Sequence, residues 1–276
     1  MPRELAEAWP YWAAVSAFAA FALWETFVPD RTPDTSPVAK WVGHFALYAA
    51  SLAAGNLAGR FEWAPRLLGE QGQEPLTWLG AYAGDAIVLI SGLLAFDLFI
   101  YGMHRVEHGV TVFWRLHAVH HADEAVDLST ALRHHPLEYL VNGTIGNLIF
   151  AVLGMPVWVM AWYVILSVAV GLFQHANIRL AGWLEALLDT VIVGPSMHRA
   201  HHSADPLHYN SNFGIVFSFW DRLFGSYRRL DSVEQDRIIF GVREVTEAGW
   251  AGVISAWALP FLIRGRPRPA SRLAKT

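Results

Sequence analysis

Four long apolar stretches constrain the fold of this chain more than any other feature. They cover approximately residues 12–28, 41–57, 86–103 and 139–173. A helix needs roughly 20 mostly apolar residues to cross the hydrocarbon core of a bilayer. The fourth stretch is too long for one crossing, and Gly154 with Pro156 divides it into two helices or a hairpin. The sequence therefore predicts an all-α, multi-pass membrane bundle with four or five membrane helices.

The composition agrees with a membrane setting and excludes several classes of chemistry. Charged residues make up only 16% of the chain, against about 25% in a typical soluble protein. The net charge of −4 offers no basic surface, so no nucleic-acid partner is expected. The absence of cysteine excludes disulfides, thiolate nucleophiles and cysteine-ligated iron–sulfur clusters.

Two polar segments, residues 104–138 and 176–249, are expected to pack into one cap on a single side of the membrane. The last apolar segment, residues 250–263, is too short to cross, so an interfacial helix is predicted there. The basic tail that follows has no acidic residue, which places the tail and the cap in the cytoplasm. Its charges are Arg264, Arg266, Arg268, Arg272 and Lys275.

Eight of the 13 histidines fall into three tight clusters within the polar segments. The clusters have the forms HxxxH, HxxHH and HxxHH, and they contain His104 and His108, then His117, His120 and His121, then His198, His201 and His202. Helical offsets of three and four residues place side chains on one face. Adjacent residues such as His120 and His121 diverge by about 100°, so one helix could serve two metal ions. Imidazole is the commonest protein ligand for transition metals, and a structural zinc needs only four ligands. The clusters therefore predict a site for two ions.

A carboxylate lies on the same helical face as the first cluster. Asp97, Tyr101, His104 and His108 are separated by four, three and four residues. An unpaired carboxylate inside an apolar span is expensive. Asp97 is therefore predicted to orient a metal-ligating histidine from behind, with a simple helix–helix hydrogen bond as the alternative.

The other histidines have weaker patterns. His175 ends an apolar stretch and is expected to be a ligand at its rim. His134 and His135 directly precede a proline that should begin a helix, and His135 is the predicted ligand of the two. His208 is expected to be peripheral or to support a ligand from behind. His44 stands alone in the second apolar stretch, where a helix–helix hydrogen bond is the better interpretation.

A donor set made only of imidazole nitrogens suits iron, zinc, copper or nickel. Two irons can activate O2 to take hydrogen from an unactivated C–H bond, and a membrane lipid is the nearest substrate. Two alternatives remain. A metal transporter or sensor would place its coordinating groups at mid-bilayer depth, whereas these clusters lie outside the spans. A zinc-dependent lipid hydrolase would need a glutamate base, and Glu107 is not in the HExxH arrangement.

Four segments carry a resemblance to a known family. FDLFIYGMHRVEH, RLHAVHH, PSMHRAHHSAD and NFGIVFSFWDRLFGSY resemble, in order and spacing, the fatty acid hydroxylase and sterol desaturase superfamily over about residues 86–230. Members are integral membrane, non-haem di-iron oxygenases acting on sterols, fatty acyl chains, sphingolipids, alkylglycerol ethers or carotenoids. The residues at metal-ligand positions are then His104, His108, His117, His120, His121, His175, His198, His201 and His202, with His135 as a tenth. Asp97 and residues 220–225 match framework positions.

The resemblance also implies a division of the chain and a set of partners. Residues 1–85 are expected to be N-terminal membrane helices, 86–249 the catalytic domain, and 250–276 the interfacial helix and tail. The segment HHADEAVDLSTALRHHPLE looks closest to bacterial members and to the alkylglycerol monooxygenase branch of the superfamily, and a bacterial inner membrane is expected. Two Fe ions (with Zn possible on isolation), O2 and a lipid substrate are implied. The sequence has no GxGxxG motif and no cysteine, so electrons are expected from a separate donor protein or a diffusible reductant.

Overall fold

The computed structural model describes residues 9–32, 37–59, 84–247 and 252–263. Within these residues the backbone forms helices and two isolated bridges, with no strand. The predicted all-α class is confirmed. The basic tail lies outside the described residues.

Five long helices form the elongated part of the molecule: α2 (Trp9–Phe27), α3 (Pro37–Gly59), α6 (Asp85–Gly109), α8 (Pro136–Val152) and α9 (Val157–His175). By length and composition, α6 and α9 are able to cross a membrane, which supports membrane association. The other apolar stretches are helical, but the described residues of α2, α3 and α8 do not meet the same combined requirement of length and apolar composition. Four or five spans therefore remain a prediction.

The long fourth apolar stretch is divided where the sequence indicated. Gly154 has a φ of 56°, in the left-handed region that glycine adopts without a steric cost. Pro156 is the N-cap of α9 and cannot continue the preceding helix. α8 therefore ends before this turn, and α9 returns from it toward the histidines.

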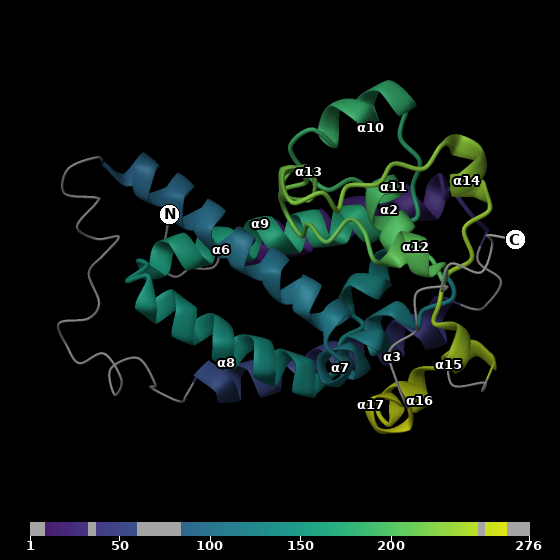
Figure 1. The fold of residues 1–276 in the computed structure, drawn as a ribbon, viewed down its shortest axis with the longest axis horizontal. Coiled ribbons are helices and arrows are strands. Elements are labelled where there is room, and N and C mark those ends of the chain that lie inside the picture. Colours follow the sequence, from purple (N-terminus) through teal and green to yellow (C-terminus); the bar gives the residue numbers. More distant parts are fainter. Residues whose placement is uncertain (1–8, 33–36, 60–83, 248–251, 264–276) are drawn as a thin grey trace, which may run out of the picture.

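Figure 1 shows α8 and α9 joined at one end of the molecule and separating toward the other end, where α7 (Thr111–His121) lies. α3 packs along α8, and α2 packs along α9. The shorter elements are η2 (Leu128–Leu132), α10 (Gly182–Leu188), α11 (Pro195–His201), α12 (Pro206–Tyr209), α13 (Phe219–Leu223), α14 (Ser232–Asp236) and α15 (Arg243–Glu247). Figure 1 shows α10 to α14 on the same side of the molecule as α9. The ends of α6, α7 and α9 that carry histidines meet one another and α11.

The segment 250–263 differs from the single interfacial helix expected. Its described residues form two short helices, α16 (Val253–Ala256) and α17 (Leu259–Leu262). Pro260 lacks a backbone N–H, so it starts a new helix more readily than it continues one. Ala256, Leu259 and Ile263 are buried in one cluster with residues of α3 and α7. The apolar side of this segment therefore covers α7.

Candidate metal centre

The three clusters and His175 converge from four helices into two adjacent groups. The first histidine group contains His104, His108, His117, His121 and His201; the second contains His120, His175, His198 and His202. Within each group the candidate ligand atoms lie within 4.8 Å of one another. Nine of the ten histidines predicted from the sequence are thus brought together.

Neighbouring residues on a helix are divided between the two groups. On α7, His117 and His121 face the first group, whereas His120 faces the second. On α11, His201 contributes to the first group, and His198 and the adjoining His202 to the second. The rings of His121 and His202 stack at 4.5 Å between centroids, so the two groups adjoin.

The Nε2 atoms of these rings lie at a spacing that suits metal ligands. In the second group, the Nε2 atom of His175 is 2.9 Å from that of His198, 3.1 Å from that of His120 and 3.2 Å from that of His202. In the first group, His104 Nε2 lies 3.1 Å from His117 Nε2 and 3.0 Å from His201 Nε2. Nitrogen ligands about 2.1 Å from a metal ion and at right angles to each other are about 3.0 Å apart.

The Nδ1 atoms of several rings form hydrogen bonds to backbone carbonyls. A carbonyl only accepts, so the Nδ1 facing it must carry the proton, and Nε2 is left with its lone pair. Three rings are fixed in this way: His104 donates to the Phe213 carbonyl (2.8 Å), His201 to that of Ser211 (2.7 Å) and His175 to that of Gly171 (2.7 Å). These hydrogen bonds set both the tautomer and the ring direction that a ligand needs.

Burial favours the neutral form of most of these rings, with His117 as an exception. All nine histidines are at most 4% exposed. Burial lowers the pKa of His201 to about 3, and it lowers the pKa values of His120, His121, His198 and His202 well below their usual range. Metal ligation requires this deprotonated form.

Some ring nitrogens have no hydrogen-bond partner among the described residues. They include both nitrogens of His108 and Nε2 of His121. A buried polar atom without a partner costs free energy. Bound ions would satisfy these nitrogens, so the residues present fit a metal pair.

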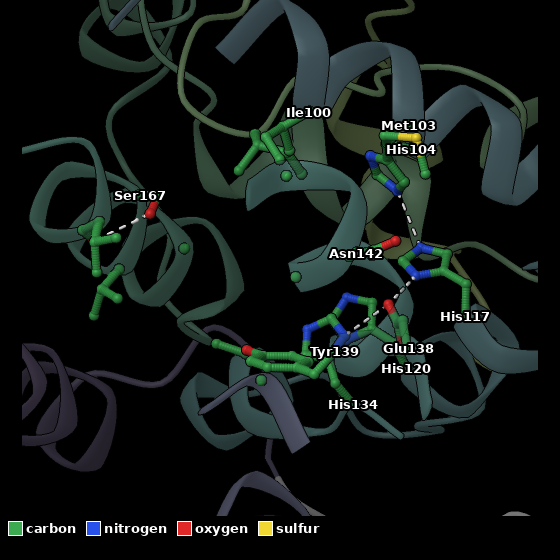
Figure 2. A pocket seen from close by; sticks show the side chains of 18 of the residues that line it. Ile100, Met103, His104, His117, His120, His134, Glu138, Tyr139, Asn142 and Ser167 are labelled. Carbon is green, nitrogen blue, oxygen red and sulfur yellow. Dashed lines mark hydrogen bonds and ion pairs between the residues drawn. The ribbon is translucent and has the colours of Figure 1, made fainter. Parts of the chain in front are cut away.

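A polar network that sequence reasoning missed supports the first group. The Oε1 atom of Glu138 lies 2.9 Å from His117 Nδ1 and 3.1 Å from His134 Nδ1. Figure 2 shows Glu138 between these two rings. Glu107 Oε2 lies 3.6 Å from His117 Nδ1, and Asn142 donates to Glu107. Burial opposes protonation of His117, but the two carboxylates outweigh it and raise its pKa.

His134 and His135 take opposite positions. The His134 ring stacks on that of His120, with centroids 4.3 Å apart. His135 is outside both groups: its Nδ1 accepts from the backbone N–H of Leu137 as the N-cap of α8, and its Nε2 donates to the Trp257 carbonyl. The backbone is extended at His135, and successive side chains on extended backbone point to opposite sides. Glu138, four residues after His134, was the signal in the sequence for which of the two rings lies beside the histidine groups.

Asp97 does not contact a histidine. Its carboxylate accepts from Tyr163 Oη (2.9 Å), from Trp220 Nε1 (2.9 Å), and from the backbone N–H groups of Val216 (3.2 Å) and Phe217 (3.1 Å). It therefore ties the segment before α13 to α6 and α9. The same segment supplies the Phe213 carbonyl that orients His104, so the influence of Asp97 on the histidines is indirect.

The two remaining histidines, His44 and His208, lie outside both histidine groups. His44 is fully buried, with Nδ1 2.8 Å from Ser129 Oγ. Asp123 and Asp127 lie near it, and the Lys40 ammonium is 3.0 Å and 2.9 Å from their carboxylates. That ammonium occupies the position a cation would need. His208 is at the periphery, 3.3 Å from Ser203 Oγ.

A cavity of about 460 Å³ opens beside the histidines and extends between α6, α8 and α9. His104, His120 and His175 line one end, and the lining continues to Phe96, Gly146 and Met160. Most other lining side chains in the part away from the histidines are apolar. The cavity therefore offers a lipid chain a path to the histidine groups.

Comparison with known proteins gives relatives over this same region. The chain is 27% identical over 181 residues to ornithine lipid hydroxylase OlsE of Rhizobium tropici, covering 66% of this chain and 52% of the relative. It is 30% identical over 173 residues to alkylglycerol monooxygenase of Danio rerio (61% and 35%) and 25% identical over 162 residues to human lathosterol oxidase (58% and 52%). The chain thus matches about half or less of each relative's length. No solved structure matches.

The family model described as fatty acid hydroxylase matches residues 89–226, half of the chain. The match includes every histidine of both groups. On this ground, and with the histidine geometry in accord, the chain belongs to the fatty acid hydroxylase family.

Proposed function

We propose that this protein is a membrane-bound, O2-dependent oxidoreductase of the non-haem di-iron type that hydroxylates, or desaturates, a C–H bond of a lipid. The observation that carries the proposal is the pair of adjoining histidine groups at the end of an apolar cavity. Family membership and relatives named for the oxidation of ornithine lipid, alkylglycerol and lathosterol support a lipid substrate.

The first histidine group would hold one ion and the second would hold the other, with zinc as a possible replacement on isolation. Iron bound there would supply the O2 activation that cleaves a C–H bond. Histidine donors alone also suit copper, nickel and zinc, so the metal itself has to be measured.

The chain's own residues prepare the site. Backbone carbonyls hold three rings with Nε2 directed inward. Glu138 accepts the proton of His117 Nδ1 in a hydrogen bond and so fixes that ring as well. Asp97 holds the segment that presents the Phe213 carbonyl. The apolar walls in the rest of the cavity would hold the lipid chain that leads to the histidine end.

We further propose the setting of the enzyme. The apolar helices α6 and α9 would lie in a bacterial inner membrane, with the short helices on the cytoplasmic side. A separate donor protein or a diffusible reductant would supply electrons, since the sequence has no cysteine for an iron–sulfur centre.

The test is O2 consumption by the purified, iron-loaded protein with a bacterial lipid extract and a chemical reductant. Mass spectrometry should find a lipid with one added oxygen, or with two hydrogens removed. His120→Ala and His201→Ala, one from each group, should abolish turnover and lower the iron content, with His208→Ala as the matched control. Full iron content and turnover in either variant would refute the ligand assignment. Lipid cleavage without O2 would indicate the hydrolase, and metal uptake into vesicles without lipid turnover the transporter.

A further inference from the structure

One glycine on the cavity wall has no explanation in the packing of the protein. Gly171 lies in the interior of α9, one turn before His175, and it lines the cavity. A Cβ atom built at Gly171 would meet nothing within 4 Å. Glycine is the least favourable residue for a helix interior after proline, so its presence calls for a compensating role.

The usual reasons for a helical glycine do not apply here. Gly171 is not among the described glycines with a positive φ. Two other cavity glycines, Gly143 and Gly146, face packed neighbours: their Cβ atoms would lie 3.4 Å from Ala58 Cβ and 3.6 Å from Phe96 Cζ. The His175 hydrogen bond uses the Gly171 carbonyl, which any residue would provide. What glycine alone provides at this position is open space in the cavity.

We propose that Gly171 is a specificity-determining residue: its missing side chain keeps the passage along α9 open, so that one unbranched lipid chain can extend from the histidines into the apolar part of the cavity. This inference rests on the proposed function and names the kind of chain that the site accepts. A branched or long side chain at residue 171 would separate the histidine end of the cavity from the remainder.

The cavity lining on α9 gives the length of the chain. It runs from Met160 to His175, which at 1.5 Å per residue is about 22 Å. The part from Met160 to Gly171 is about 16 Å by the same rise. Three extended backbone bonds span about 3.6 Å, so a polymethylene chain advances about 1.2 Å per bond. The whole cavity therefore suits about 18 carbon atoms, and the part beyond Gly171 about 13.

The experiment measures binding of unbranched fatty acids with 8 to 18 carbons to the metal-free, full-length protein, by displacement of a fluorescent fatty acid. In the unaltered protein the affinity should rise, by up to roughly fourfold per methylene, to the longest chains. In Gly171→Leu the rise should stop near 12 or 13 carbons, while shorter chains bind as before. An unchanged length dependence to 18 carbons would overturn the proposal.

Gly102→Leu is the matched control. Gly102 lies in the interior of α6, a Cβ there also meets nothing within 4 Å, and it does not line the cavity. The affinity of Gly102→Leu should rise with fatty acid length as it does in the unaltered protein. A chain-length cutoff in Gly102→Leu as well would overturn the proposal. If Gly171→Leu does not fold, Gly171→Met carries the same two outcomes with an unbranched side chain that favours helix.

The proposed function and this inference fail separately. Binding is measured without metal, so the chain-length cutoff in Gly171→Leu can be observed even if O2-dependent lipid oxidation is absent. If oxidation occurs but Gly171→Leu shows no cutoff, only the role of Gly171 is removed. With iron bound, Gly171→Leu should keep the full iron content and lower kcat/KM at least tenfold for a C18 lipid, because that chain no longer reaches the histidines.

Discussion

The cluster around His44 and the two histidine groups are both buried, and they differ in how their polar atoms are satisfied. Around His44, the carboxylates of Asp123 and Asp127 are paired with the Lys40 ammonium. In the two histidine groups, ring nitrogens face one another at about 3 Å, and several have no partner among the described residues. The His44 cluster is complete as a set of side chains, whereas the two histidine groups need ions to satisfy their ring nitrogens. Hydrogen-bond satisfaction thus separates a structural histidine from a candidate ligand better than burial does.

Replacing one histidine from each kind of cluster should give the largest contrast. His201→Ala removes a nitrogen that lies 3.0 Å from His104 Nε2. It should reduce the metal content from two ions per chain to one or none and reduce turnover by about 10³-fold or more. His44→Ala should retain both ions. Metal analysis of the two purified variants checks the contrast, and equal loss in both would erase it.

Acid should destabilise the metal-free protein through the histidine groups. Burial lowers the folded-state pKa of His120, His121, His198, His201 and His202, while the unfolded value is about 6.5. The unfolded chain therefore binds more protons, and stability is complete above pH 6.5 and is lost as the pH falls below it. Each ring contributes up to about 1.4 kcal/mol per pH unit.

Melting temperatures of the metal-free protein between pH 7.5 and 5 measure this effect. Added Fe²⁺ or Zn²⁺ should move the loss to lower pH, because the metal competes with protons for the same nitrogens. A melting temperature that does not change over this range would contradict the neutral state of the rings.

Removing the Lys40 ammonium should leave the His44 cluster without the cation that pairs with its two carboxylates. Lys40→Met leaves Asp123 and Asp127 without their common partner. Burial opposes the charge on Asp123, but Lys40 and Arg133 outweigh it and lower its pKa. The expected cost is about 3 kcal/mol of unfolding free energy, with no loss of metal. Thermal unfolding and metal analysis of the same sample distinguish this result from damage to the histidine groups.

Asp97 should behave as part of the framework. Asp97→Asn keeps one acceptor oxygen and turns the other into a donor that faces N–H groups. We expect a loss of about 2 kcal/mol in stability and retention of both ions. Glu138→Gln should show the reverse, with metal affinity about 10-fold weaker and little change in stability. Equal metal loss in both variants would assign Asp97 a role close to that of Glu138.

Much of the candidate site followed from local spacing. The HxxHH pattern places His117 and His121 on one side of α7 and turns His120 away, because adjacent helical residues differ by about 100°. The structure has this division, with His120 in the second group. The division of α8 from α9 likewise depended on Gly154 and Pro156, whose backbone restrictions act within a few residues.

Other features depended on contacts between segments far apart in the chain. The choice of His134 over His135 depended on Glu138 and on the Trp257 carbonyl, which is 122 residues away. The partners of Asp97 came from α9 and from residues 216–220. No periodicity encodes such pairings.

By itself, the sequence determined the long apolar helices and which face of the histidine-bearing helices carries imidazole, because both depend on the repeat of the helix and on the residues within one or two turns. Only the tertiary structure decided which carboxylate supports which ring, which histidine of a neighbouring pair faces the centre, and where the wall is left open at Gly171. Those outcomes depend on side chains from separate helices competing for the same hydrogen bonds and the same volume, and that competition is settled only when the helices pack.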